Sequence, residues 1–217
     1  MNNNFNKEIY TKINELFYHD KKRLAHVLGV ADLTFALAAR YNVNLDDAYV
    51  AGLLHDCAKN YSWEELISIS ESNNIPITES EYRSPYLLHA KVGALFAKEK
   101  YNVDNEDICE AIECHTTGKV GMNRLSEILF IADYLEPNRK HSELLDELRY
   151  MAFEDLEMTM YIILRESLNH LKSKHLPIDP MTEDTFAYYD NIIKNREQRV
   201  EKGEYNGRQR YNNDGKP

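Results

Sequence analysis

Cysteines, long apolar runs and excess positive charge are all scarce in this sequence, and each scarcity argues against a class of protein. Its 3 cysteines form neither an even disulfide set nor a Cys-x-x-Cys pair, which favours a reducing, cytoplasmic compartment. No apolar run is long enough to cross a bilayer and the polar start does not resemble a secretory signal, so we expect no membrane partner. The formal net charge of −10 provides no basic field that would attract nucleic acid.

Alternating β-strand patterns are lacking as well. No stretch combines sustained apolar–polar alternation with enrichment in β-branched side chains, so we expect no sheet. A chain of 217 residues without an evident linker favours a single compact helical bundle with additional C-terminal helices, which is an all-α fold. We expect an N-terminal helix within 1–18, one domain over 19–200, and a polar, disordered tail over 201–217.

Apolar residues at helical spacing predict helices at about 6–17, 21–40, 46–57, 63–73, 89–100, 105–115, 124–136, 142–152, 154–174 and 183–200. Capping residues support several of these boundaries. Asn44 is expected to cap 46–57, and Thr182 is expected to cap 183–200. Ser62 and Glu65 form a capping-box pattern before 63–73. The segment 74–88 contains two prolines and is predicted to be a loop.

His55 and Asp56 stand side by side at the end of the apolar segment 49–54. A carboxylate beside core residues is costly to bury unless something pairs with it, and a divalent metal ion suits a histidine and a carboxylate together. Other residues that bind metals also have apolar neighbours or stand at helix ends. They are His26, His89, His115 and Asp133. Because each lies on a different predicted helix, a bundle could gather them in its core.

A single histidine with apolar neighbours has an ordinary alternative explanation. It is more often a hydrogen-bonded core residue than a metal ligand, and this applies separately to His26, His89 and His115. The combination of all the residues, in the order H…HD…H…H…D, is what favours a metal site.

This order resembles that of the HD-domain metal-dependent phosphohydrolases, whose defining motif H…HD…D would be His26, His55-Asp56 and Asp133. The two further histidines match the members of that superfamily that hold two metals. More narrowly, the chain resembles the bacterial symmetrical bis(5′-nucleosyl)-tetraphosphatase (diadenosine tetraphosphate hydrolase) family over about residues 22–193. The motifs that carry this resemblance are RLAHVLGV, LLHDCAK, LLHAKVGA, HTTG, IADYLEPNR and IDPMT.

The resemblance implies a role for each of these ligands. Asp56 would bridge two divalent transition-metal ions. The other ligands would divide into His26, His55 and Asp133 at one ion, and His89 and His115 at the other. A set of histidines and carboxylates without thiolate suits Fe, Mn, Co, Ni or Zn, and the resemblance favours iron. Two such ions a few ångströms apart would lower the pKa of a shared water and so supply a metal-bridging hydroxide at neutral pH.

Lys59 and Arg139 are the residues that we expect to hold phosphate and to stabilise its charge during catalysis. Lys59 lies about one helical turn after Asp56. Arg139 follows Pro137, so it should leave the helix and enter a loop near Asp133. Each has an alternative explanation, as a lysine favoured by the dipole at a helix C-terminus and as a surface arginine.

Two further segments are expected to contact the substrate. They comprise Thr116, Thr117 and Gly118, and Pro177, Ile178 and Asp179. The first segment follows His115 and offers hydroxyl and N–H donors, although glycine also commonly ends helices. The second contributes to the nucleotide pocket if the resemblance holds, and a rigid connector before the last helix is an equally compatible interpretation.

The resemblance implies hydrolysis of diadenosine 5′,5‴-P1,P4-tetraphosphate to two ADP, by hydroxide attack on a phosphoanhydride phosphorus. The partners would be a dinucleoside polyphosphate and ADP, and a homodimer is compatible with the sequence. Two alternatives stay open. One is another HD phosphohydrolase acting on a nucleotide or alarmone, and the other is a nucleotide-binding regulatory protein with little turnover. Residue spacing does not distinguish one phosphoanhydride from another, so symmetric cleavage is implied by the resemblance alone.

Overall fold

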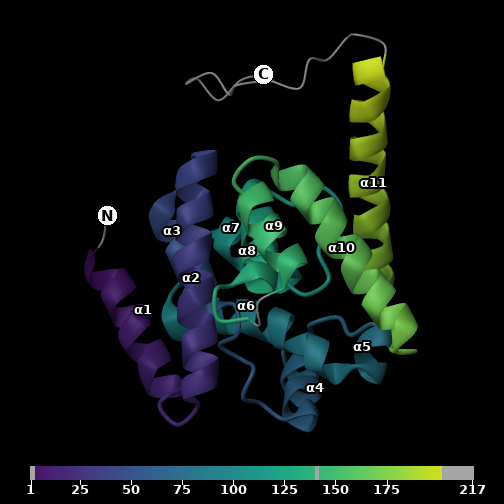
Figure 1. Ribbon diagram of the computed structural model, residues 1–217. Coiled ribbons are helices and arrows are strands. Elements are labelled where there is room, and N and C mark those ends of the chain that lie inside the picture. The colour runs from purple at the N-terminus through teal and green to yellow at the C-terminus, as the bar shows by residue number, and fades with distance from the viewer. Residues whose placement is uncertain (1–2, 140–141, 202–217) are drawn as a thin grey trace.

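The computed structural model describes residues 3–139 and 142–201, and within these residues every regular element is a helix (Figure 1). The prediction of an all-α fold is confirmed. The predicted tail lies outside the described residues from 202 onward, and the division into an N-terminal helix and one domain stays a prediction. The elements are α1 (Asn3–Leu16), α2 (Lys21–Tyr41), α3 (Leu45–Leu54), α4 (Trp63–Ser72), α5 (Glu79–Arg83), the 3₁₀-helix η1 (Pro85–Leu87), α6 (Leu88–Tyr101), α7 (Glu106–Cys114), α8 (Arg124–Leu135), α9 (Glu143–Met151), α10 (Leu156–Ser173) and α11 (Pro180–Glu201).

Helix α2 packs most extensively against α3 and also contacts α8 (Figure 1). A Cβ atom added to Gly52 of α3 would lie 2.5 Å from the Cα atom of Ala31 in α2. Glycine at this position therefore lets the two helix backbones approach closely. This close approach brings the end of α3, where His55 lies, next to the α2 residue His26.

Helix α2 is also long and apolar enough to meet a length-and-composition criterion for a membrane span. This differs from the expectation that no apolar run qualifies. Core helices of folded domains meet the same criterion, and α2 has buried side chains and packs against α3 and α8. Its apolar character is accounted for by this packing.

Two clusters of buried apolar side chains share α8. Leu125 and Leu129 of α8 pack into a cluster built from α1 to α4, α6 and α7. Ile128 and Ile131 pack into a second cluster, to which α9, α10 and α11 contribute. The last two helices lie together along one side of the molecule (Figure 1). As a result, α8 holds Asp133 at the junction between the two clusters.

Most predicted helix starts agree with the structure, because the capping side chains are the ones that the sequence indicates. Asn44 accepts hydrogen bonds from the backbone N–H groups of Asp46 and Asp47. Ser62 and Glu65 form a reciprocal capping box at the start of α4. Such caps satisfy N–H groups that have no partner within the helix, and they fix where a helix begins.

Three of the differences from the predicted boundaries have a clear local cause. Helix α3 ends at Leu54, so that His55 is its C-cap and 55–60 form turns. The predicted loop 74–88 contains α5 and η1, because Thr78 and Glu81 form a second capping box. The last helix begins at Pro180, with Asp179 accepting a hydrogen bond from the backbone N–H of Met181 at 2.9 Å, so Thr182 is not its cap. Proline at the first helical position suits this arrangement, because its missing N–H would have no partner there.

Candidate metal centre

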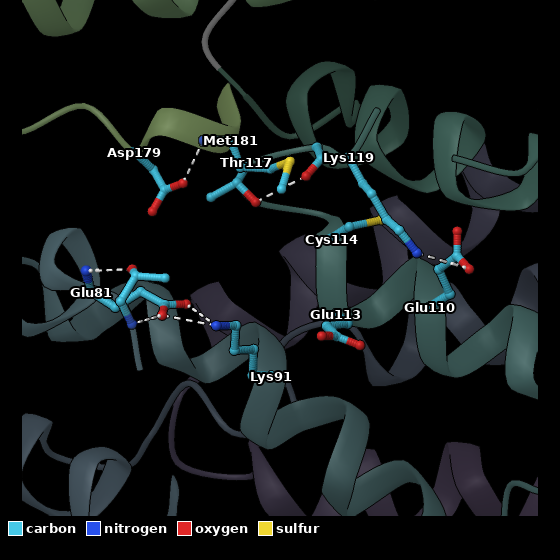
Figure 2. A pocket seen from close by; sticks show the side chains of 11 residues that line it. Glu81, Lys91, Glu110, Glu113, Cys114, Thr117, Lys119, Asp179 and Met181 are labelled. Atoms are coloured by element: carbon cyan, nitrogen blue, oxygen red, sulfur yellow. Dashed lines mark hydrogen bonds and ion pairs between the residues drawn. The ribbon is translucent and has the colours of Figure 1, made fainter. Parts of the chain in front are cut away.

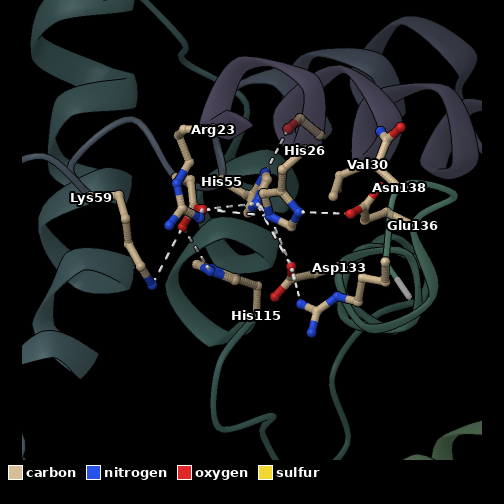
Figure 3. Close-up of polar contacts among 12 residues, drawn as sticks. Arg23, His26, Val30, His55, Lys59, His115, Asp133, Glu136 and Asn138 are labelled. Atoms are coloured by element: carbon tan, nitrogen blue, oxygen red, sulfur yellow. Dashed lines mark hydrogen bonds and ion pairs between the residues drawn. The ribbon is translucent and has the colours of Figure 1, made fainter. Parts of the chain in front are cut away.

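Five elements bring the predicted ligands to one place in the interior (Figure 3). His26 comes from α2, His89 from α6 and Asp133 from α8, whereas His55 and His115 are the C-caps of α3 and α7. Asp56 follows His55 directly and is 2% exposed. His55, His89 and His115 are also buried. The ligand atoms of Asp56 and the four histidines form two groups that share Asp56, and each group could hold a metal ion.

The first group surrounds Oδ2 of Asp56. His26 Nε2 lies 3.6 Å from this oxygen, and His55 Nε2 lies 3.5 Å from it. The two histidine Nε2 atoms are 3.2 Å apart. Asp133 Oδ1 lies beside this group, 3.2 Å from His26 Nε2 and 3.9 Å from His55 Nε2.

The second group surrounds Oδ1, the other oxygen of the same carboxylate. His89 Nε2 lies 3.2 Å from Asp56 Oδ1, and His115 Nε2 lies 3.9 Å from it. The Nε2 atoms of His89 and His115 are 3.1 Å apart. The two oxygens of Asp56 therefore face different sets of histidines, as a bridging carboxylate requires.

These separations fit ligands arranged around a common ion. A metal–nitrogen or metal–oxygen distance of about 2.1 Å places neighbouring ligand atoms roughly 3.0 Å apart in octahedral geometry and roughly 3.4 Å apart in tetrahedral geometry. The observed separations run from 3.1 Å to 3.9 Å. Small side-chain movements would bring the longer ones into range.

Backbone carbonyl groups orient three of the four histidines. Nδ1 of His55 faces Gly52 O at 2.7 Å, Nδ1 of His89 faces Tyr86 O, and Nδ1 of His115 faces Ile112 O at 2.7 Å. A carbonyl oxygen accepts hydrogen bonds and donates none, so each Nδ1 carries a proton. In the neutral form of each ring, the Nε2 lone pair then points into the cluster, as metal coordination requires.

The charges of the cluster favour cation binding. Burial acts to raise the pKa of Asp56, but His55, His89 and Lys59 outweigh it and hold that pKa well below its usual value. Burial also acts to raise the pKa of Asp133, but the hydrogen bond from His26 and the nearby histidines outweigh it, so that pKa is lowered as well.

The histidines divide into two kinds. Burial and the neighbouring His89 and His55 lower the pKa of His115 to about 3. Burial also lowers the pKa of His89. Burial opposes protonation of His55 too, but Asp56 outweighs it and raises the His55 pKa. At neutral pH the cluster thus contains ionised carboxylates and at least two neutral imidazoles.

Both predicted phosphate-binding cations lie at the cluster. Lys59 Nζ is 3.0 Å from His89 Nε2 and 3.7 Å from Asp56 Oδ1. Arg139 Nη2 is 3.3 Å from Asp133 Oδ1, in the loop where the sequence places it. Their side chains are 30% and 43% exposed, so both remain accessible to an anion from solvent.

Two residues of the site were not assigned from the sequence. Arg23 Nη1 lies 2.5 Å from Asp56 Oδ2. Glu136 Oε1 lies 3.4 Å from His26 Nδ1 (Figure 3). Arg23 stands one helical turn before His26, and this spacing is the sequence feature that could have placed it at the site. Glu136 is distant in sequence from His26, and only folding brings the two together.

A cavity of about 280 Å³, called the polar cavity here because most of the residues that line it are polar or charged, lies beside the turn that follows His115 (Figure 2). Thr117 and Gly118 line it from that turn, and Asp179 lines it from the start of α11. Three of the predicted substrate-binding residues are thus brought together from segments far apart in sequence. The other three lie differently: Thr116 and Ile178 are half-buried and Pro177 is exposed.

Comparisons with known proteins agree on one family. The HD domain model matches residues 23–138. The chain is 33% identical to a symmetrical bis(5′-nucleosyl)-tetraphosphatase of Bacillus subtilis strain 168, over 79% of this chain and 89% of that protein. It is 34% identical to a probable nicotinate-nucleotide adenylyltransferase/Ap4A hydrolase of Mycoplasma genitalium, over 70% of this chain and 44% of that protein. A crystal structure described as a predicted HD superfamily hydrolase involved in NAD metabolism, from Clostridium acetobutylicum, superposes with a TM-score of 0.80 at 35% identity and covers 84% of this chain and 97% of its own.

Proposed function

This chain belongs to the HD domain family, and from that premise we propose that it hydrolyses diadenosine 5′,5‴-P1,P4-tetraphosphate symmetrically to two ADP. The observation that carries this proposal is the pair of ligand groups that share Asp56. Water would add to one of the two central phosphorus atoms. The bond from that phosphorus to the oxygen between the two central phosphorus atoms would break, and the second ADP would leave with that oxygen. The relative from Bacillus subtilis is named for this symmetrical cleavage.

The donor set indicates which cofactor fits. Histidine nitrogens and carboxylate oxygens without a cysteine ligand suit Fe, Mn, Co, Ni or Zn, and we propose two iron ions. His26, His55, Asp56 and Asp133 would hold one ion, and Asp56, His89 and His115 would hold the other. When bound, such ions supply a nucleophilic hydroxide at neutral pH and neutralise the phosphate oxygens.

The accessible cations would bind the polyphosphate. Lys59 lies 3.7 Å from Asp56 and Arg139 lies 3.3 Å from Asp133, so each reaches a different carboxylate of the proposed ligand set. A phosphate beside the carboxylates would attract both side chains. Arginine can hold two phosphate oxygens through parallel hydrogen bonds, whereas lysine supplies a point charge. Their role is to orient the phosphate chain and to stabilise charge as the bond breaks.

The polar cavity would take one nucleoside end of the substrate. Its wall combines the hydroxyl of Thr117, the carboxylate of Asp179 and the thioether of Met181. Carboxylates accept hydrogen bonds from ribose hydroxyls or an exocyclic amino group, and an apolar sulfur suits the face of a base. The phosphates would then run from the cavity toward His115, which precedes Thr117 by two positions.

The decisive experiment is product analysis with the purified protein loaded with Fe²⁺ or Mn²⁺. We expect ADP as the product from diadenosine tetraphosphate. ATP with AMP would refute symmetric cleavage. Faster turnover of another nucleotide or alarmone in the same panel would identify a different HD phosphohydrolase, and tight ADP binding without turnover would identify a regulatory protein.

Matched variants test the metal centre itself. Asp56→Ala should abolish both turnover and metal binding, because each ligand group contains Asp56. Asp184→Ala removes an exposed carboxylate of α11 and should change neither. Turnover retained by Asp56→Ala would sink the two-metal proposal.

A further inference from the structure

The four histidines of the centre differ in the group that faces the Nδ1 atom of the ring. Backbone carbonyl groups hold His55, His89 and His115, whereas the carboxylate of Glu136 faces Nδ1 of His26 at 3.4 Å (Figure 3). A carboxylate behind a ligating histidine makes the ring a stronger donor than a neutral carbonyl does. His26 is therefore set apart electronically from the other histidines.

Glu136 is fixed in place on both of its oxygens. It is 3% exposed, and its Oε2 accepts a hydrogen bond from the backbone N–H of Asn138 at 2.6 Å. The Asn138 side chain in turn donates to Ala25 O in α2 at 2.9 Å. A Cβ atom at Gly29 would lie 2.7 Å from Oε2, so glycine there leaves the room that the carboxylate occupies.

We propose that Glu136 is a positioning residue for His26 and that it makes the metal position of His26, His55 and Asp133 the tighter-binding of the two. This inference rests on the proposed metal centre and does not depend on the substrate. The first position has Asp133 and Glu136 in addition to its share of Asp56. The second position has only its share of Asp56, with two histidines whose Nδ1 atoms face backbone carbonyl groups. More negative charge around one position strengthens its attraction for a divalent cation.

The cations near the centre do not reverse this ranking. Arg23 and Arg139 contact carboxylate oxygens of the first position, and such an oxygen has lone pairs for both a hydrogen bond and a metal ion. Lys59 contacts His89 Nε2 itself, the atom that would bind the second ion. A metal at the second position must therefore displace a lysine from its own ligand, which weakens binding there further.

The test is a Mn²⁺ titration of the full-length, metal-stripped protein by calorimetry, with electron paramagnetic resonance as a second readout. The wild-type protein should show a tighter site and a weaker site. Glu136→Gln keeps the side-chain shape and removes its charge, so it should weaken the tighter site by about 10–100-fold and leave the weaker one unchanged. Glu136→Asp should give an intermediate loss, since it keeps the charge but shortens the reach. His89→Ala should remove the weaker site.

Glu8→Gln is the matched control, because it makes the same chemical change at an exposed glutamate of α1 that pairs with Lys12. It should leave both sites unchanged, and thermal unfolding of each stripped variant should confirm a folded chain. Two equal sites in the wild type, or equal weakening of both sites by Glu136→Gln, would overturn this inference alone. A wild-type protein that binds no Mn²⁺ would overturn the inference together with the proposed metal centre.

Discussion

Arg23 Nη1 lies 2.5 Å from Asp56 Oδ2, the oxygen that also faces the Nε2 atoms of His26 and His55. A guanidinium group and a metal ion would therefore both offer positive charge to this one oxygen. Asp56 is 2% exposed, so removing its arginine from the metal-free protein leaves a buried carboxylate with less compensation.

Arg23→Met should lower the stability of the metal-free protein by about 1–3 kcal/mol, because a buried charge loses a hydrogen-bonded partner while Lys59 and the histidines remain. With Mn²⁺ bound, the metal supplies the missing charge and the loss should shrink. Thermal unfolding with Mn²⁺ and with chelator measures both values. An equal loss in the two states would mean that Arg23 acts through packing and not through Asp56.

Lys59→Met should affect metal binding and turnover in opposite directions. Lys59 Nζ lies 3.0 Å from His89 Nε2, so removing the ammonium group should strengthen Mn²⁺ binding at the second position. The same change removes a phosphate-binding cation and should lower kcat by about 100-fold or more. Calorimetry and steady-state kinetics test the two halves, with Lys98→Met as control because its pair with Glu106 is exposed. Weaker Mn²⁺ binding in Lys59→Met would contradict the competition.

The fold was predictable from local signals, and the exceptions have local causes. Helix starts followed from caps such as Asn44 and Ser62, because a side chain that binds a nearby N–H is readable within four residues. Thr78 and Glu81 carry the same signal, but two prolines in the segment favoured a loop. At the last helix, Asp179 and Thr182 are both good caps, and Pro180 is the feature that decides between them.

The proposed metal ligands could be picked out of the sequence because they are unusual residues among apolar neighbours, and because the order of the motifs is intact. Glu136 and Arg23 could not, because a glutamate or an arginine is ordinary on a surface. Their roles depend on contacts with His26 and Asp56, which are distant in the sequence. Which oxygen of Asp56 faces which histidines is likewise a property of three-dimensional geometry alone.

Asp155 links the start of α10 to α11 and should make stability depend on pH. It accepts a hydrogen bond from the N–H of Met158 at 3.0 Å and a bidentate contact from Arg196, with Nη1 at 3.0 Å. Burial acts to raise the Asp155 pKa, but Arg196 and the backbone N–H groups outweigh it, so the pKa is lowered. A lowered pKa in the folded state gives stability that is present above the unfolded value of about 3.9 and is lost as the pH falls through the folded value.

Asp155→Asn keeps a capping side chain but loses the charge, so it should cost about 1–2 kcal/mol at pH 7 and progressively less below pH 4. Urea unfolding at a series of pH values measures this difference. Glu8→Gln breaks an exposed pair with Lys12 and should produce no measurable change. A constant loss for Asp155→Asn from pH 7 to pH 3 would show that the ion pair contributes nothing.

Gly118 and Gly121 lie in the same connection between α7 and α8 and provide a matched pair for the last prediction. Both have positive φ, at 71° and 68°, where a side chain is strained. They differ in their surroundings. A Cβ atom at Gly118 would lie 2.7 Å from Thr185 Cγ2 in α11, whereas a Cβ atom at Gly121 would have nothing within 4 Å.

Gly121→Ala should therefore cost only the backbone strain, roughly 1–2 kcal/mol. Gly118→Ala adds a steric conflict with α11 and should cost about 2–4 kcal/mol. It should also lower turnover, because Gly118 lines the polar cavity and its turn follows His115. Thr185→Ser removes the conflicting methyl group and keeps the hydroxyl that donates to Met181 O, so the double variant should recover part of both losses. Urea unfolding and kinetics of the four variants measure this coupling. Equal losses for the two glycine variants would mean that contact between the turn and α11 does not hold the turn in place.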